Sequence, residues 1–163
     1  MAQSGTQPET QVLGDMIYQG HFAVTSVVEY GASLQMVATG AEAVPACGLR
    51  VDVGFEGAVS GRINGTLSGV DYLDIRADGR IELHVHGELT TDEGTKIAVH
   101  VEGVGLRQPT GQSLLREHVK LKTADPAYAW VNPLEIWGVG LVDLAAGTID
   151  VTAYLPVGRE LFA

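Results

Sequence analysis

The chain of 163 residues has a single cysteine, only three phenylalanines and half as many basic residues as acidic ones. With Cys47 alone, no disulfide can form within the chain, which is typical of a reducing compartment, and we expect a cytoplasmic protein. Ten basic and twenty acidic residues give a formal net charge of −10. That charge would repel nucleic acid and anionic membrane surfaces, so we expect neither as a partner. No apolar run is long enough for a membrane-spanning helix.

The pattern of a long helix is also missing. No stretch beyond about ten residues keeps apolar side chains three and four positions apart. Instead, 21 glycines are scattered among short runs of valine, isoleucine, leucine and threonine. Glycines in this setting are typical of tight turns and bends between strands. The composition therefore favours an all-β protein.

The clearest strands lie in the middle of the chain. Apolar and polar residues alternate over residues 81–89 and again over residues 97–101. Alternation with a period of two places side chains on opposite faces of an extended strand. Because the connection over residues 91–94 contains Asp92 and Gly94, the two runs are predicted to form an antiparallel hairpin.

Short runs of this kind recur along the chain, with turn residues between them. Many short strands at regular spacing indicate a sandwich or a barrel. Consecutive hairpins favour an up-and-down barrel, because closure removes the exposed edges. We predict a flexible tail over residues 1–12 and a single all-β domain over residues 13–163. This domain is expected to be an antiparallel, calycin-like barrel of about 8–10 strands with at most one short helix. Residues 112–117 are the candidate for helical turns, and residues 128–132 are predicted to form a strand.

Four short motifs connect the chain with a known family. They are Gly69-Val70-Asp71-Tyr72, Arg76-Ala77-Asp78-Gly79, Leu89-Thr90-Thr91-Asp92-Glu93-Gly94 and Pro126-Ala127-Tyr128-Ala129-Trp130-Val131-Asn132. In order and spacing they resemble the bacterial and fungal family called domain of unknown function 3237, over about residues 18–154. The resemblance implies a compact antiparallel β-barrel and no agreed reaction. The chain departs from the family at Tyr72, where tryptophan is usual, and at His84 and His86, where an acid and an arginine are common.

Histidines gather on the polar face of the predicted hairpin. His84 and His86 share one face of the first strand, and His100 lies on the second, with Glu82 and Glu102 beside them. If the strands bring the imidazoles together, three histidines and a carboxylate could bind zinc or non-haem iron. The alternative is a solvated outer face of a barrel with an apolar lumen. We predict no bound metal and keep a metal-dependent enzyme as an alternative.

A second group of candidates combines aromatic and polar side chains. Tyr128, Trp130 and Asn132 would share a face of one strand, and Tyr72 and Arg76 come from an earlier strand. The rings would stack on a flat ligand, while Arg76 and Asn132 would bind an oxygen of a carbonyl, enolate or carboxylate. The alternative to a ligand pocket is that the rings pack in the core and that Arg76 forms an ion pair with a neighbouring acid.

These patterns predict a barrel that binds one small hydrophobic or aromatic molecule. We expect a lyase, isomerase or cyclase that acts on a carbonyl compound without a cofactor. Arg76 would stabilise developing negative charge, and His86 or Asp71 would move the proton. The predicted catalytic residues are Asp71, Arg76, His86 and Tyr128, and the predicted ligand-binding residues are Tyr72, Trp130, Asn132, His84 and His100. A lipocalin-like carrier or sensor without catalysis is one alternative, and an interaction module with a filled barrel is another. Such a barrel can also pair with a second copy, so a homodimer is expected.

Overall fold

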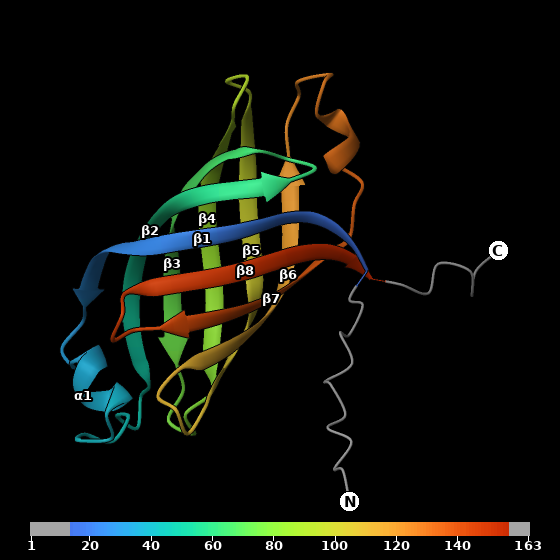
Figure 1. Ribbon diagram of the computed structural model, residues 1–163. Coiled ribbons are helices and arrows are strands. Elements are labelled where there is room, and N and C mark those ends of the chain that lie inside the picture. Colours follow the sequence, from blue (N-terminus) through green and yellow to red (C-terminus); the bar gives the residue numbers. More distant parts are fainter. Residues whose placement is uncertain (1–13, 157–163) are drawn as a thin grey trace, which may run out of the picture.

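The computed structural model describes residues 14–156, which form a closed barrel of eight antiparallel strands (Figure 1). Each strand pairs with its neighbour in sequence, and the last pairs with the first. The strands are β1 (Gly14–Glu29), β2 (Leu49–Gly61), β3 (Gly65–Ile75), β4 (Ile81–Thr91), β5 (Lys96–Arg107), β6 (Ser113–Lys122), β7 (Ile136–Asp143) and β8 (Thr148–Pro156). The predicted all-β class and up-and-down barrel are confirmed, whereas the predicted tail over residues 1–12 lies outside the described residues.

The alternating sequence sets the two faces of the barrel wall. On β4, Ile81, Leu83 and Val85 are buried inside, whereas His84 and His86 are exposed outside. β4 and β5 form the predicted hairpin. Burial of one apolar face along every strand fixes the register, because a slip by one residue would turn that face to water.

The first strand bends sharply as it closes the barrel. Its register shifts between Met16 and Tyr18 against β8, and between Val24 and Ser26 against β2. Such bulges increase local twist and allow a strand to curve. Where β2 crosses β1, a Cβ on Gly57 would lie 2.0 Å from the carbonyl oxygen of His21, so only glycine fits at this close approach.

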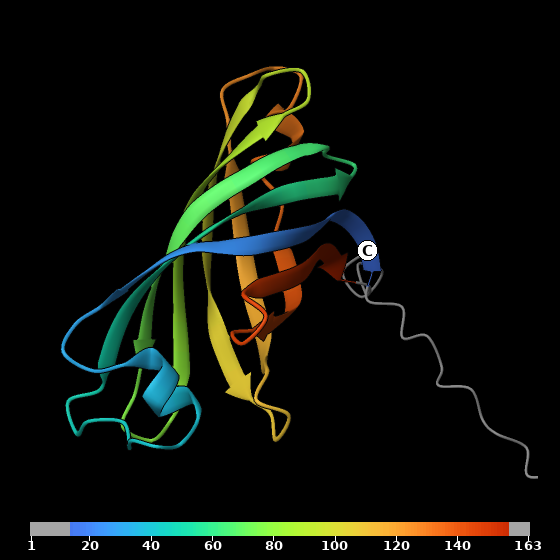
Figure 2. The same ribbon diagram turned by 60° about the vertical axis from the view of Figure 1, so that its left-hand side comes forward.

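Apolar clusters fill the two ends of the barrel. At one end the short helix α1 (Leu34–Ala38) packs Leu34 and Val37 against β2, β3, β4 and β6. At the opposite end the 3-10 turn η1 (Ala129–Val131) lies beside the β4–β5 turn, and Val131 is fully buried. Figure 2 shows α1 and η1 at these opposite ends from a second side. Among the described residues no helix has the length and apolar character to cross a membrane.

Two local predictions are wrong. Residues 112–117, predicted as helical turns, lead into and begin β6, because Leu115 and Glu117 face inward while Leu114 and Arg116 face outward.

Residues 128–132, predicted as a strand, contain η1 instead. The carboxylate of Asp125 accepts a hydrogen bond from the amide of Ala127 at 2.9 Å, which closes a turn before η1. The side chain of Asn132 then bonds both backbone groups of Thr123, at 2.9 and 2.8 Å. These side-chain bonds to the backbone replace the ladder that a strand would need.

Candidate functional site

A cavity of about 110 Å³ lies inside the barrel. Its wall is built mainly by apolar side chains from all eight strands and from α1, drawn from both end clusters. A dry cavity of about 150 Å³ in another protein holds benzene, so this space suits a body of roughly one ring. The lumen is therefore the place in this fold where a small apolar molecule could be enclosed.

Two carboxyl groups line this apolar space. Asp71 comes from β3 and Glu117 from β6, on different sides of the barrel. The phenol of Tyr18, from β1, also lines it. Among the described residues, the cavity lining contains no acidic side chain other than those of Asp71 and Glu117. Carboxyl groups in an apolar lumen are costly to ionise, which makes them the chemically distinctive feature of the cavity.

Small neighbours make room for the carboxyl of Glu117. Its partners in the ladder are Gly103 on β5 and Gly138 on β7, and the row continues through Ala153 on β8 to Tyr18 on β1. A Cβ on Gly138 would lie 2.8 Å from Oε2 of Glu117. Because Gly138 and Ala153 carry little or no side chain, the carboxyl and the phenol share the space above them.

Burial dominates the electrostatics of Glu117. The residue is 6% exposed, and its carboxyl makes no hydrogen bond within the described residues. Burial, and secondarily the negative charge of Asp71, raise its pKa to about 7. Burial and the charge of Glu117 also raise the pKa of Tyr18 above its ordinary value. At neutral pH, Tyr18 is a neutral phenol, and Glu117 keeps its proton far more readily than an exposed glutamate would.

Asp71 is held by the wall of the barrel. The ladder between β3 and β4 is interrupted after the pair Asp71–Val85 and resumes at Asp74–Glu82. Within the gap, the backbone N–H of His84 donates to Oδ1 of Asp71 at 2.9 Å. Burial raises the pKa of Asp71 to about 6, although the His84 hydrogen bond opposes the rise. Asp71 is therefore mostly ionised at pH 7.

Together the two acids can transfer protons inside the lumen. Their pKa values of about 6 and about 7 lie close to neutral pH, and the charge of Asp71 disfavours ionisation of Glu117. Because Glu117 has the higher of the two pKa values, it keeps its proton to a higher pH than Asp71 does. A carboxylate base and a carboxylic acid on different walls of a largely apolar cavity are what general acid–base catalysis requires.

Of the predicted site residues, Asp71 lines the cavity and the others lie elsewhere. His84, His86, His100 and Tyr72 are on the outer face, because they alternate with the apolar residues that fill the lumen. The ring centroids of His86 and His100 are 4.8 Å apart, and those of Tyr72 and His86 are 5.9 Å apart. The imidazoles form a row across neighbouring strands, and among the described residues no group of three or more histidine, cysteine, aspartate or glutamate side chains is arranged to hold a metal ion. The row lies on the solvated outer face, which is the alternative that the sequence left open for these histidines.

The predicted charge-stabilising arginine lies in a turn. Arg76 directly follows β3, is exposed, and pairs with Oδ2 of Asp78 at 2.8 Å and with Glu82 at 3.7 Å. This is the ion pair that the sequence left as an alternative, and it places the guanidinium outside the lining of the cavity.

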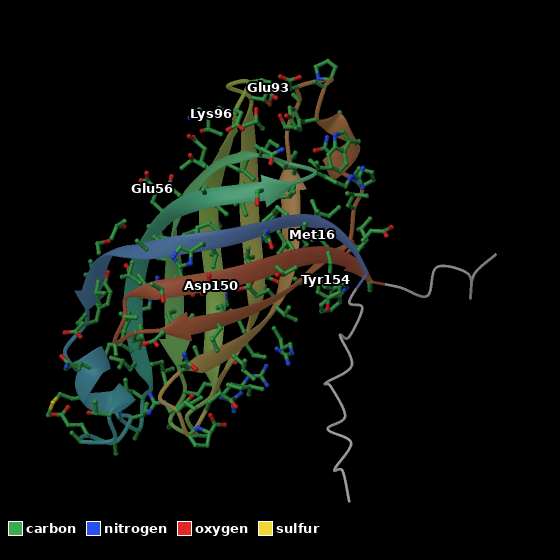
Figure 3. The ribbon with its side chains drawn as sticks, viewed as in Figure 1. Met16, Glu56, Glu93, Lys96, Asp150 and Tyr154 are labelled. Carbon is green, nitrogen blue, oxygen red and sulfur yellow. The ribbon has the colours of Figure 1, made fainter. Side chains whose placement is uncertain are left out.

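The predicted aromatic face is also absent, because residues 128–132 do not form a strand. The hydroxyl of Tyr128 donates to Oε2 of Glu93 at 2.6 Å, and Figure 3 shows Glu93 at the η1 end of the barrel. The guanidinium of Arg62 lies 4.3 Å from the centre of the Trp130 ring. Asn132 is engaged with the backbone of Thr123. These side chains hold the end of the barrel and do not line the cavity.

The predicted site residues did not include Glu117, Tyr18 or Arg107, the last residue of β5, although all three line the cavity. For Glu117 a signal was present, because it stands in the same alternating row as Leu115 and Val119. An acid within an apolar row of a strand is a candidate for the lumen. Because residues 112–117 were predicted to form helical turns, the alternation around Glu117 was not interpreted as a strand. Tyr18 and Arg107 depend on how the strands close, which alternation does not specify.

Comparison with known proteins places this barrel among others of similar shape. A family model described as "Protein of unknown function (DUF3237)" matches residues 50–154. No curated protein matches the chain.

Three solved structures illustrate the likeness. A β-barrel-like protein from Acinetobacter baumannii is 16% identical with a TM-score of 0.70, covering 91% of this chain and 98% of that chain. A protein of unknown function from Clostridium acetobutylicum is 18% identical with a TM-score of 0.69, covering 85% of this chain and 94% of that chain. An enzyme from Penicillium herquei is 18% identical with a TM-score of 0.58, covering 91% of this chain and 98% of that chain. At these identities the likeness shows the fold.

Proposed function

The chain belongs to the DUF3237 family, and from the geometry of its lumen we propose that it binds and transforms a small carbonyl compound. The proposed activity is that of a cofactor-independent lyase, isomerase or cyclase on a hydrophobic or aromatic substrate enclosed in the barrel. Asp71 and Glu117 carry the proton transfers. The row of histidines and the residues around η1 take no part, because they do not line the cavity.

The observation that carries this proposal is the pair of acids in an otherwise apolar cavity. A carrier of apolar ligands has no need of Asp71 or Glu117 in its lumen. Burial that raises the pKa of both groups makes their ionised forms unfavourable, and such costs are typical of functional sites. A protein of the same fold from Penicillium herquei is described as an enzyme, which supports catalysis on this scaffold.

The proposed chemistry begins with hydrogen bonding to the carbonyl oxygen. The protonated carboxyl of Glu117 donates to this oxygen, and the phenol of Tyr18 lies in the same row of the wall to donate a second hydrogen bond. The carboxylate of Asp71 removes a proton from the carbon next to the carbonyl, and Glu117 stabilises the enolate oxygen. Return of the proton to another carbon gives isomerisation, loss of a leaving group gives elimination, and internal attack gives cyclisation.

The experiment follows the first step without a known substrate. Acetophenone, which has one ring and a carbonyl, is incubated with the protein in D₂O, and NMR follows loss of the methyl proton signal. We expect the protein to accelerate exchange, Asp71→Asn to remove the acceleration, and Glu117→Gln to reduce it strongly. Glu102→Gln is the matched control, because the Glu102 side chain is 56% exposed on the outer face.

Three results would contradict the proposal. Exchange at the rate of buffer alone would remove the support for catalysis, and bound acetophenone without exchange would favour the carrier. Acceleration that survives Asp71→Asn would place the base elsewhere. The cytoplasmic location and the homodimer stay predictions.

A further inference from the structure

Polar groups line the cavity at two separate levels. Glu117 lies in the middle of β6, and Ser113 begins that strand four residues earlier on the same inward face. Four residues of strand span ~13 Å. Arg107, the last residue of β5, pairs with Ser113 across the ladder, and both line the cavity. Glu117 therefore occupies one level, while a cation and a hydroxyl occupy the level next to α1.

Arg107 is the cation of the described cavity lining. Its Nη1 donates to the backbone carbonyl of Val37 in α1 at 2.9 Å. Within residues 14–156 it has no carboxylate partner, although the chain has twice as many acidic as basic residues. The arginines that do pair with carboxylates are Arg50, Arg76 and Arg80. One guanidinium N–H group of Arg107 donates to Val37, and its other N–H groups are available to bind a ligand at the α1 end.

We propose that Arg107 and Ser113 bind the anionic group of a ligand whose carbonyl lies at Asp71 and Glu117. This inference rests on the proposed function and names its substrate class, a small oxo acid. A guanidinium and a hydroxyl side by side match the oxygens of a carboxylate. The whole cavity of about 110 Å³ leaves room for roughly one ring of apolar body between the carboxylate and the carbonyl.

The charges also fix the direction in which the ligand enters. If the ligand entered the other way round, its carboxylate would lie at the level of Glu117. There it would face the ionised Asp71 and the buried carboxyl of Glu117 in an apolar lumen, which is unfavourable. With the carboxylate at the α1 end, it meets Arg107 and leaves the carbonyl at the acids. Arg107 therefore sets both orientation and specificity, without taking part in the proton transfers.

The test uses two probes that differ only in charge. The carboxylate 4-acetylbenzoate and the neutral 4-acetylbenzamide both carry an acetyl group for the acid end of the cavity. Calorimetric titration at pH 7.5 and low salt gives the ratio of their dissociation constants. We expect at least tenfold tighter binding of the carboxylate. Arg107→Gln should reduce this preference to about onefold, and the matched control Arg80→Gln, on the exposed β3–β4 turn, should keep it.

The ratio separates charge recognition from damage to the fold. Loss of the bond between Arg107 and Val37 would weaken both probes equally, whereas loss of an anion contact weakens only the carboxylate. If Arg107→Gln binds neither probe, Ser113→Ala decides, with an expected loss of about tenfold or more in preference, as for a hydrogen bond to a charged group.

Three outcomes overturn the inference. Equal binding of both probes by the unaltered protein refutes the oxo acid class and leaves the proposed function intact. A preference that persists in Arg107→Gln and Ser113→Ala places the anion elsewhere. If the unaltered protein binds neither probe, the lumen does not bind small carbonyl compounds, and the proposed function is refuted as well.

Discussion

Replacing Glu117 with glutamine should change the dependence of stability on pH. Burial raises the pKa of Glu117 from 4.5 to about 7 in the folded protein. Between these values the folded state holds a proton that the unfolded state has released, so the free energy of unfolding falls as pH rises. The difference in pKa corresponds to about 3 kcal/mol, present below the unfolded pKa and lost through the folded pKa. Most of it, about 2.5 kcal/mol, is lost between pH 5 and pH 8.

Urea unfolding followed by circular dichroism measures this effect. The unfolding free energy of Glu117→Gln minus that of the unaltered protein should rise by about 2.5 kcal/mol from pH 5 to pH 8. An unpaired glutamine amide in the lumen adds a cost that is the same at both pH values, so the change with pH isolates the carboxyl. Glu102→Gln, on the outer face, should follow the unaltered protein. A difference that stays constant from pH 5 to pH 8 would refute the reasoning, because Glu117 would then not titrate in this range.

Three further predictions follow from the same geometry. The rate of proton exchange should peak between pH 6 and pH 7 and fall on both sides, because Asp71 must be ionised and Glu117 protonated. A pH–rate profile that is flat from pH 5 to pH 8 would be inconsistent with these roles. Gly138→Ala should lower the unfolding free energy by about 1–3 kcal/mol and slow exchange, because its Cβ would lie 2.8 Å from Oε2 of Glu117; urea unfolding and NMR measure both effects. His86→Ala and His100→Ala should change stability by less than about 0.5 kcal/mol and leave probe binding unchanged in calorimetry, and a weakened titration would place these rings in the site.

Most of the barrel could be predicted because its wall has a simple pattern. Alternation over residues 81–89 and 97–101 identified β4 and β5, and short turns implied consecutive hairpins. Prediction of β6 failed where Leu114 and Leu115 are adjacent, since two neighbouring apolar residues fit a helical turn as well as a strand. It failed around Trp130, because aromatic residues that are common in strands here hold a 3-10 turn.

The site was harder to predict because it depends on closure. Asp71 and Glu117 each stand in an apolar row of a strand, which marks them as inward-facing. Only the closed register of β1, β8, β7 and β6 brings Tyr18 and Glu117 into the same row of the wall. The histidines attracted attention because they alternate with valine and leucine, and that same alternation places them outside. Bulges such as the one between Met16 and Tyr18 leave no clear signal in the sequence.

The central claim is that Asp71 and Glu117 are proton-transfer groups in a lumen that receives a carbonyl compound. NMR titration of the ¹³C-labelled side-chain carboxyls, with and without acetophenone, tests it most directly. We expect Asp71 to titrate at about 6 and Glu117 at about 7, and we expect acetophenone to shift both resonances while leaving that of Glu102 unchanged. Ordinary titration of both groups near pH 4 with no response to acetophenone would contradict it.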